Sequence, residues 1–148
     1  MRRRPATTPI RRARPAAGRD DDDMIGHLFV YGTLRPGDCR WHLLEPFVVD
    51  GGWPDSVPGR LFDTGFDYPA AVFDERGTIH GHTFALLSGS LGRALEVLDD
   101  VEGTVTGDYR RVVVRTAVGI DAWAYASSED LLVRPITSGD WFLHRPPT

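Results

Sequence analysis

The sequence contains no lysine, a single cysteine (Cys39) and no long uninterrupted hydrophobic segment. One cysteine excludes an internal disulfide framework and a zinc site built only from thiolates. A transmembrane helix needs roughly 20 consecutive apolar residues, and no segment approaches that length. We therefore expect a cytoplasmic protein that does not bind membranes. Its 148 residues fit one domain, because domains commonly contain ~100–150 residues.

Charge is distributed unevenly along the chain. Residues 1–23 contain seven arginines and four aspartates, a net charge of +3, whereas the remainder contains ten arginines and seventeen acidic residues, a net charge of −7. Because an acidic surface repels phosphates, we expect no nucleic-acid binding by the acidic part. A basic arm for nucleic acid or an anionic membrane at residues 1–23 is an alternative that rests on composition alone.

Residues 1–23 have few side chains that could form a core. Besides Met1, Ile10 is their one large aliphatic residue, and three prolines interrupt the segment. So little apolar surface cannot offset the conformational entropy lost on ordering, and no apolar segment typical of a secretory signal follows the arginines. We predict a disordered extension at residues 1–23 and a folded domain at residues 24–148. Alternatively, the true start is Met24, where the hydrophobic pattern begins.

The hydrophobic pattern of the remaining residues predicts a mixed α+β domain. Leu91, Leu95 and Leu98 recur at the spacing of an amphipathic helix that ends near Gly103. A second, short helix is expected at residues 40–45, capped by Asp38. Short strands are expected at residues 27–31, 59–62, 70–73, 78–87, 109–117 and 120–127. These elements favour an α+β domain or a small barrel flanked by helices.

The segment Tyr31-Gly32-Thr33-Leu34 follows the first predicted strand. A glycine where a strand bends into a turn allows successive backbone N–H groups to converge on an anion or a carbonyl oxygen. The absent side chain also allows a ligand to approach closely. The alternative is a plain tight turn.

An acidic cluster lies at the end of the predicted amphipathic helix. Leu98 belongs to the apolar stripe, so Asp99 and Asp100 are expected on the solvent side. Glu102 comes one turn after Leu98, near the buried edge, where partly apolar surroundings favour a carboxylate that takes up a proton at neutral pH. The alternative is an ordinary solvated helix end, although acidic residues there oppose the helix dipole.

Metal and cofactor sites find little support in the sequence. Cys39 with His42, and His80 with His82, could together form a tetrahedral zinc site, but no second strong motif accompanies either pair. No glycine pattern matches a dinucleotide fingerprint or a P-loop, and no nucleophile motif is present. We expect neither a metal nor a cofactor.

Several short motifs follow one another in a specific order, at residues 31–34, 58–62, 68–70, 80–86, 98–103, 109–111, 123–125 and 138–141. Together they resemble the γ-glutamylcyclotransferase-like family, including its AIG2-like and γ-glutamylamine cyclotransferase branches. The resemblance extends from about residue 28 to residue 141, which is most of the predicted domain. Each motif is short, and their order and spacing make the match specific.

The resemblance implies a small mixed β-barrel with flanking helices. It implies that the α-amine of a γ-glutamyl substrate attacks its own γ-carbonyl, which gives 5-oxoproline and releases the attached amine or amino acid. Glu102 matches the general acid/base of the family, and Tyr109 is expected to line the pocket. The backbone of Gly32, Thr33 and Leu34, after Tyr31, would hold the substrate. A non-catalytic protein that binds a small ligand in the same cavity remains the alternative.

Overall fold

The computed structural model describes residues 14–15, 25–36, 38, 40–66, 68–101, 109–127 and 132–145. Strands dominate it. They are β1 (Arg14–Pro15), β2 (His27–Val30), β3 (Trp53–Pro58), β4 (Arg60–Asp63), β5 (Pro69–Val72), β6 (Thr78–Ala85), β7 (Tyr109–Arg115), β8 (Asp121–Ser127) and β9 (Arg134–Ile136). The helices are α2 (Trp41–Leu44), α3 (Leu91–Asp99) and α4 (Trp141–His144), with 3₁₀ turns η1 (Glu45–Phe47) and η2 (Ser88–Ser90).

The strands form two sheets. Six strands pair in the order β1-β7-β8-β2-β6-β3, and three pair in the order β5-β4-β9. The larger sheet is mixed, because β2 pairs parallel with β8 and antiparallel with β6. The predicted α+β class is confirmed. The described strands do not close into the expected barrel, because β1 and β3 remain at the two edges of the larger sheet.

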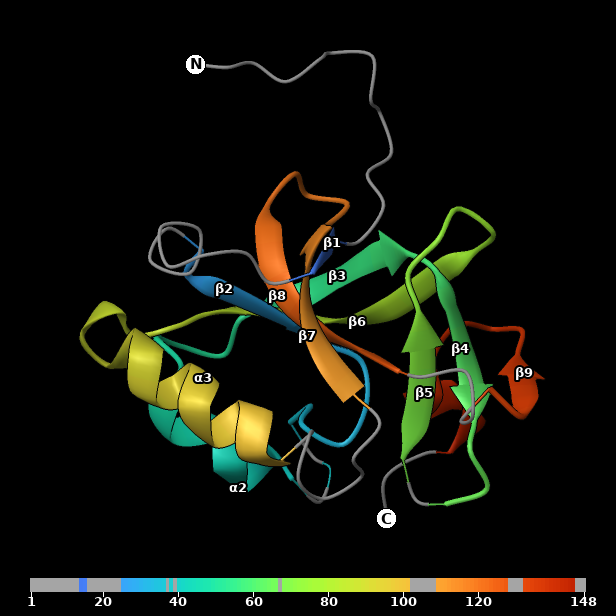
Figure 1. Ribbon diagram of the computed structural model, residues 1–148, viewed down its shortest axis with the longest axis horizontal. Coiled ribbons are helices and arrows are strands. Elements are labelled where there is room, and N and C mark those ends of the chain that lie inside the picture. Colours follow the sequence, from blue (N-terminus) through green and yellow to red (C-terminus); the bar gives the residue numbers. More distant parts are fainter. Residues whose placement is uncertain are drawn as a thin grey trace.

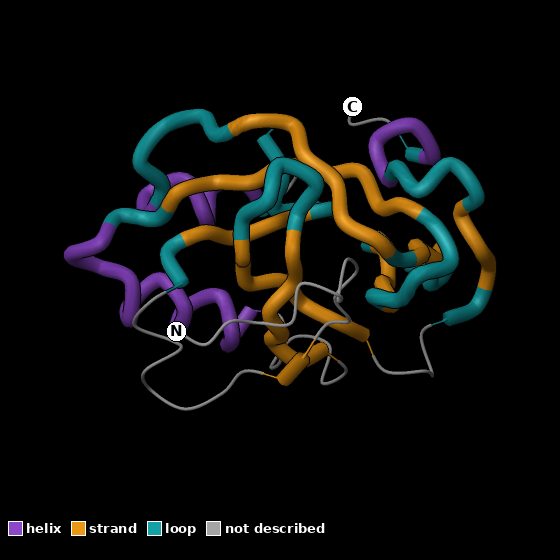
Figure 2. The backbone as a smooth tube through the Cα atoms, turned by 90° about the horizontal axis from the view of Figure 1, so that it is seen from above, coloured by secondary structure: helices purple, strands orange, loops and turns teal. Residues whose placement is uncertain are grey.

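Figure 1 shows α2 and α3 side by side on one side of the larger sheet, with the smaller sheet at the opposite end. The tube in Figure 2 places α4 at the end that holds the smaller sheet, away from the other helices. The elements therefore form successive layers: helices, a central sheet, and a second sheet.

Strict alternation along the central strands builds two cores, one on each face of the larger sheet. In β8, Trp123 and Tyr125 pack in the core beneath α3, whereas Ala122, Ala124 and Ala126 pack in the core toward the smaller sheet. In β7, Val112 and Val114 share the second core, whereas Val113 lies in the first. Successive strand residues point to opposite faces, which explains why neighbouring residues of each strand belong to different cores.

The predicted amphipathic helix is α3. Ala94, Leu95 and Leu98 are buried, and Leu91 is partly buried against the same core, as the spacing predicts. The predicted short helix is also present as α2, but it ends at Leu44, and Pro46 lies in the 3₁₀ turn that follows. Asp38 is not the cap residue, which is Arg40.

Of residues 1–23, the structure describes Arg14 and Pro15, which pair with Val113 and Val112 of β7. The boundary at residue 24 stays a prediction. No helix in the described ranges is long and apolar enough to cross a membrane.

Candidate active site

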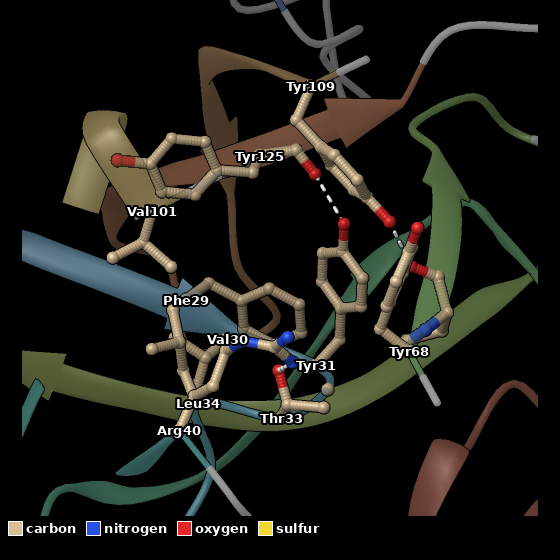
Figure 3. A pocket seen from close by; sticks show the side chains of 12 residues that line it. Phe29, Val30, Tyr31, Thr33, Leu34, Arg40, Tyr68, Val101, Tyr109 and Tyr125 are labelled. Atoms are coloured by element: carbon tan, nitrogen blue, oxygen red, sulfur yellow. Dashed lines mark hydrogen bonds between the residues drawn. The ribbon is translucent and has the colours of Figure 1, made fainter. Parts of the chain in front are cut away.

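A pocket lies where β2 ends, between the two sheets and the end of α3. It encloses about 510 Å³ of non-atom space, part of which is open solvent at its mouth. Most of its lining is apolar or aromatic (Figure 3). The lining residues are Phe29, Val30, Tyr31, Gly32, Thr33, Leu34, Arg40, Tyr68, Pro69, Val101, Tyr109 and Tyr125.

Residues 31–34, which we call the glycine loop, form one wall. Tyr31, Thr33 and Leu34 are all buried. The loop turns immediately, because the Arg35 backbone N–H donates to the Gly32 carbonyl at 3.0 Å and the Arg40 N–H donates to the Thr33 carbonyl at 2.9 Å. The carbonyls of Gly32 and Thr33 are therefore both hydrogen-bonded within the turn.

The N–H groups of the glycine loop are not engaged in the same way. Within the described part of the chain, the backbone N–H groups of Gly32, Thr33 and Leu34 donate to no other protein group. Buried backbone donors are almost always paired in folded proteins. Gly32, Thr33 and Leu34 all line the pocket, and consecutive N–H groups of this kind can together bind an oxygen of a ligand.

Gly32 meets the opposite wall of the pocket. Its φ angle is not positive, so the backbone conformation does not require glycine. A Cβ at this position would lie 2.8 Å from both Cδ and Cγ of Pro69, closer than carbon atoms pack. The close approach of Pro69 therefore accounts for the glycine at this position, and the close approach of a ligand stays a prediction.

Two tyrosines connect the walls of the pocket. The Tyr31 hydroxyl donates to the Tyr125 carbonyl at 2.6 Å, and the Tyr109 hydroxyl donates to the Pro69 carbonyl. Figure 3 shows both hydrogen bonds across the pocket. The ring of Tyr109 also meets Tyr68 edge to face, with centroids 6.3 Å apart. Hydrogen bonds of these two tyrosines thus join the walls of the pocket.

Arg35, which directly follows the glycine loop, connects the loop to α4. The Arg35 Nη1 donates to Asp140 Oδ1 at 3.2 Å, and its guanidinium lies 3.8 Å from the ring centroid of Phe142. Asp140 caps α4, because Oδ1 also accepts from the backbone N–H of Phe142. At the other end of α4, His144 contacts Asp63 Oδ2 at 2.8 Å. This hydrogen bond, together with that of the Gly65 N–H, holds the pKa of Asp63 below its usual value against the effect of burial.

The end of α3 reaches the pocket through Val101, which is a lining residue. Glu102, the predicted general acid/base, follows directly and lies outside the described residues. Asp100 is exposed, as expected. Asp99 differs from the expectation: its Oδ1 accepts from the Tyr125 hydroxyl at 2.7 Å and from Arg111 Nε at 2.9 Å. Asp99 therefore contacts a pocket residue instead of facing only solvent.

The structure brings five of the six predicted site residues to one pocket: Tyr31, Gly32, Thr33, Leu34 and Tyr109. Sequence reasoning did not single out Arg40, Tyr68 or Tyr125. Tyr68 and Tyr125 belong to motifs that carry the family resemblance, and this is the one indication of function that the sequence gives for them. Arg40 lies six residues after Leu34 in a segment without a motif.

The histidines do not form a metal cluster in the structure as described. Among the described residues, no group of three or more His, Cys, Asp or Glu could hold a metal ion. His82 and His80 both lie on β6, and the His82 Nε2 contacts the Gly51 carbonyl at 2.9 Å. His42 lies on α2, and Cys39 lies outside the described residues.

The chain belongs to the gamma-glutamyl cyclotransferase, AIG2-like family, whose model matches residues 28–143. A protein of Vibrio cholerae named "Putative gamma-glutamylcyclotransferase" is 32% identical over 115 residues, which cover 77% of this chain and 93% of that protein. The family match agrees with the resemblance that the motifs indicated.

Solved structures share the fold. An uncharacterized protein from Pyrococcus horikoshii has a TM-score of 0.63 at 23% identity, covering 80% of this chain and 92% of that one. A mouse AIG2-like protein has a TM-score of 0.59 at 17% identity, covering 75% and 84%.

Proposed function

We propose that the protein is an enzyme that releases 5-oxoproline from a γ-glutamyl amine or a γ-glutamyl amino acid by intramolecular aminolysis. The observation that carries the proposal is the glycine loop: three consecutive buried residues on the wall of the pocket have backbone N–H groups without a protein partner among the described residues. Family membership supports the same reaction class.

In the proposed reaction, Glu102 takes a proton from the α-ammonium group of the substrate. The freed amine attacks the γ-carbonyl carbon of the same molecule, and a five-membered ring closes as the carbonyl oxygen gains negative charge. The N–H groups of Gly32, Thr33 and Leu34 hold the glutamyl end or this developing oxyanion. The carbonyl then re-forms and the C–N bond to the leaving group breaks. Glu102 returns its proton to the departing nitrogen and takes up the second proton, which the ring nitrogen loses.

The nucleophile belongs to the substrate, so the proposed reaction uses no serine, cysteine or cofactor. The main task of the protein is to fold a flexible glutamyl chain into a ring-closing pose, and orientation of this kind can supply ~7–11 kcal/mol of a barrier. A narrow pocket braced by the Tyr31–Tyr125 and Tyr109–Pro69 hydrogen bonds suits that task.

The test is Glu102→Gln, which keeps the size of the side chain but removes its ability to accept a proton. Release of 5-oxoproline from a panel of γ-glutamyl substrates should fall ~10²–10⁴-fold, the usual scale of general acid–base catalysis, while calorimetry should show substrate binding retained. Asp100→Asn, at an exposed neighbouring position, is the matched control and should keep its turnover. Near-normal turnover in Glu102→Gln would contradict the proposal. Binding without turnover in the wild type would favour a non-catalytic binding protein.

A further inference from the structure

Arg40 is the one charged side chain among the described residues that line the pocket. It lies between the glycine loop and α2. Its Nη1 donates to the Thr33 hydroxyl at 3.2 Å, and its guanidinium carbon lies 6.0 Å from the ring centroid of Tyr68. Figure 3 shows the guanidinium nitrogens beside the Thr33 hydroxyl, within the ring of lining side chains.

The largely apolar surroundings of Arg40 strengthen the electrostatic attraction between its guanidinium and an anionic ligand group. The other described lining residues are aliphatic, aromatic or carry hydroxyl groups. The hydroxyl protons of Tyr31, Tyr109 and Tyr125 already serve protein acceptors. In an apolar, partly enclosed site, a guanidinium attracts anions and repels cations more strongly than in water. Its planar donors also match a carboxylate well.

A γ-glutamyl substrate can carry a carboxylate at either end. The glycine loop supplies donors for the glutamyl end. Arg40 lies on the side of Tyr68, whose ring stacks on that of Phe66 with centroids 5.7 Å apart, and Phe66 is 59% exposed. This pair of rings leads from a lining residue of the pocket to solvent, and we assign it to the side of the leaving amine.

We propose that Arg40 selects γ-glutamyl substrates whose leaving amine carries a carboxylate, that is, γ-glutamyl amino acids or peptides over simple γ-glutamyl amines. This inference rests on the proposed function and narrows its substrate class. Arg40 binds the leaving-group carboxylate, with the rings of Tyr68 and Phe66 beneath the leaving group. Arg40 is thus a specificity-determining residue and takes no part in proton transfer.

The experiment compares two substrates that differ by one carboxylate: γ-L-glutamyl-L-alanine and γ-L-glutamyl-ethylamide. Wild type should favour the alanine compound by about tenfold or more in kcat/KM, the scale of one hydrogen bond to a charged group. In Arg40→Gln this preference should fall to within about threefold, and Arg40→Lys should restore part of it. Arg93→Gln is the control, because Arg93 lies exposed on α3, and it should keep the full preference.

Binding of 5-oxoproline, measured by calorimetry, separates the two ends of the substrate. This product lacks the leaving group, so its affinity should be unchanged in Arg40→Gln. A large loss of 5-oxoproline affinity would overturn the inference, because Arg40 would then hold the glutamyl end or the glycine loop. An unchanged substrate preference in Arg40→Gln would overturn it as well.

Failure of the proposed function gives a different result. If wild type releases 5-oxoproline from neither compound, the proposed reaction is wrong, and calorimetry with the same two compounds then decides the role of Arg40. Tighter binding of γ-L-glutamyl-L-alanine by wild type, lost in Arg40→Gln, supports carboxylate selection. Equal binding of the two compounds by wild type overturns it.

Discussion

Replacing Gly32 by valine should abolish ligand binding before it unfolds the protein. A Cβ at Gly32 would lie 2.8 Å from two ring carbons of Pro69, whereas carbon atoms pack at ~3.5–4.0 Å. The two walls must therefore separate by roughly 1 Å. Pro69 is rigid and begins β5, which pairs with β4, and its carbonyl holds the Tyr109 hydroxyl. The displacement thus reaches both walls of the pocket.

The expected cost in stability follows from this contact. Overpacking of a well-packed site typically costs ~1–3 kcal/mol. For a chain of this size each kcal/mol lowers the melting temperature by ~2–4 °C. We therefore expect Gly32→Val to melt about 2–12 °C below wild type and to remain folded at 25 °C. Gly32→Ala, which adds one carbon, should lie toward the lower end of that range.

The assay combines thermal unfolding with calorimetric titration of 5-oxoproline and γ-L-glutamyl-L-alanine. Gly26→Ala is the matched control, because a Cβ at Gly26, just before β2, would meet no atom within 4 Å. It should bind normally and melt near wild type. Normal affinity in Gly32→Val would refute the assignment of the glycine loop as the substrate site, and an equal loss of affinity in Gly26→Ala would show that the effect is not local.

Two further predictions concern carboxylates near the site. Asp99→Asn weakens the two charge-assisted hydrogen bonds that Asp99 accepts and should lower the free energy of unfolding by about 1 kcal/mol, measured in urea, whereas the exposed control Asp100→Asn should lower it by much less. The pKa of Asp63 is lowered in the folded protein, first by the hydrogen bond with His144. The ionised Asp63 carboxylate therefore stabilises the fold above its unfolded pKa of about 3.8, and this stabilisation is lost as the pH falls through the lower pKa of the folded state. In urea unfolding at pH 2–7, Asp63→Asn should be less stable than wild type near neutral pH, with the difference shrinking below about pH 4; a constant difference would contradict this.

The elements that could be predicted from the sequence are those whose periodicity is undisturbed. The alternation in β7 and β8 and the leucine stripe of α3 define buried faces on their own. β3 and β9 were not predicted, because each contains proline. Both strands lie at the edge of a sheet, where a missing N–H breaks no ladder between two strands. Edge position depends on the assembled sheet, so local sequence does not reveal it.

The same distinction applies to the candidate site: one part of it could be predicted from the sequence, and another part could not. The glycine loop could be predicted because its chemistry is concentrated in a short segment at the end of a strand. Arg40 and Tyr68 contribute to the same pocket from different segments, 28 residues apart in the numbering. Arg40 has no local signal of function, and the one signal for Tyr68 is that it belongs to a motif of the family resemblance. Arg40 and Tyr68 line one pocket because the fold brings Tyr68 beside the glycine loop.

Asp99 shows most clearly where reasoning from one helix fails. Its position relative to the leucine stripe places it toward solvent, but that geometry considers α3 alone. In the fold, Arg111 of β7 and Tyr125 of β8 are direct partners across the ladder, so both side chains emerge on the same face and reach Asp99 Oδ1 together. A negative charge at a helix C-terminus is unfavourable by itself, and the charge of Arg111 offsets it. The last turn before Glu102 is therefore joined by hydrogen bonds to Tyr125, a residue of the pocket wall, and the acidic helix end contributes to the site through contacts that no spacing within α3 encodes.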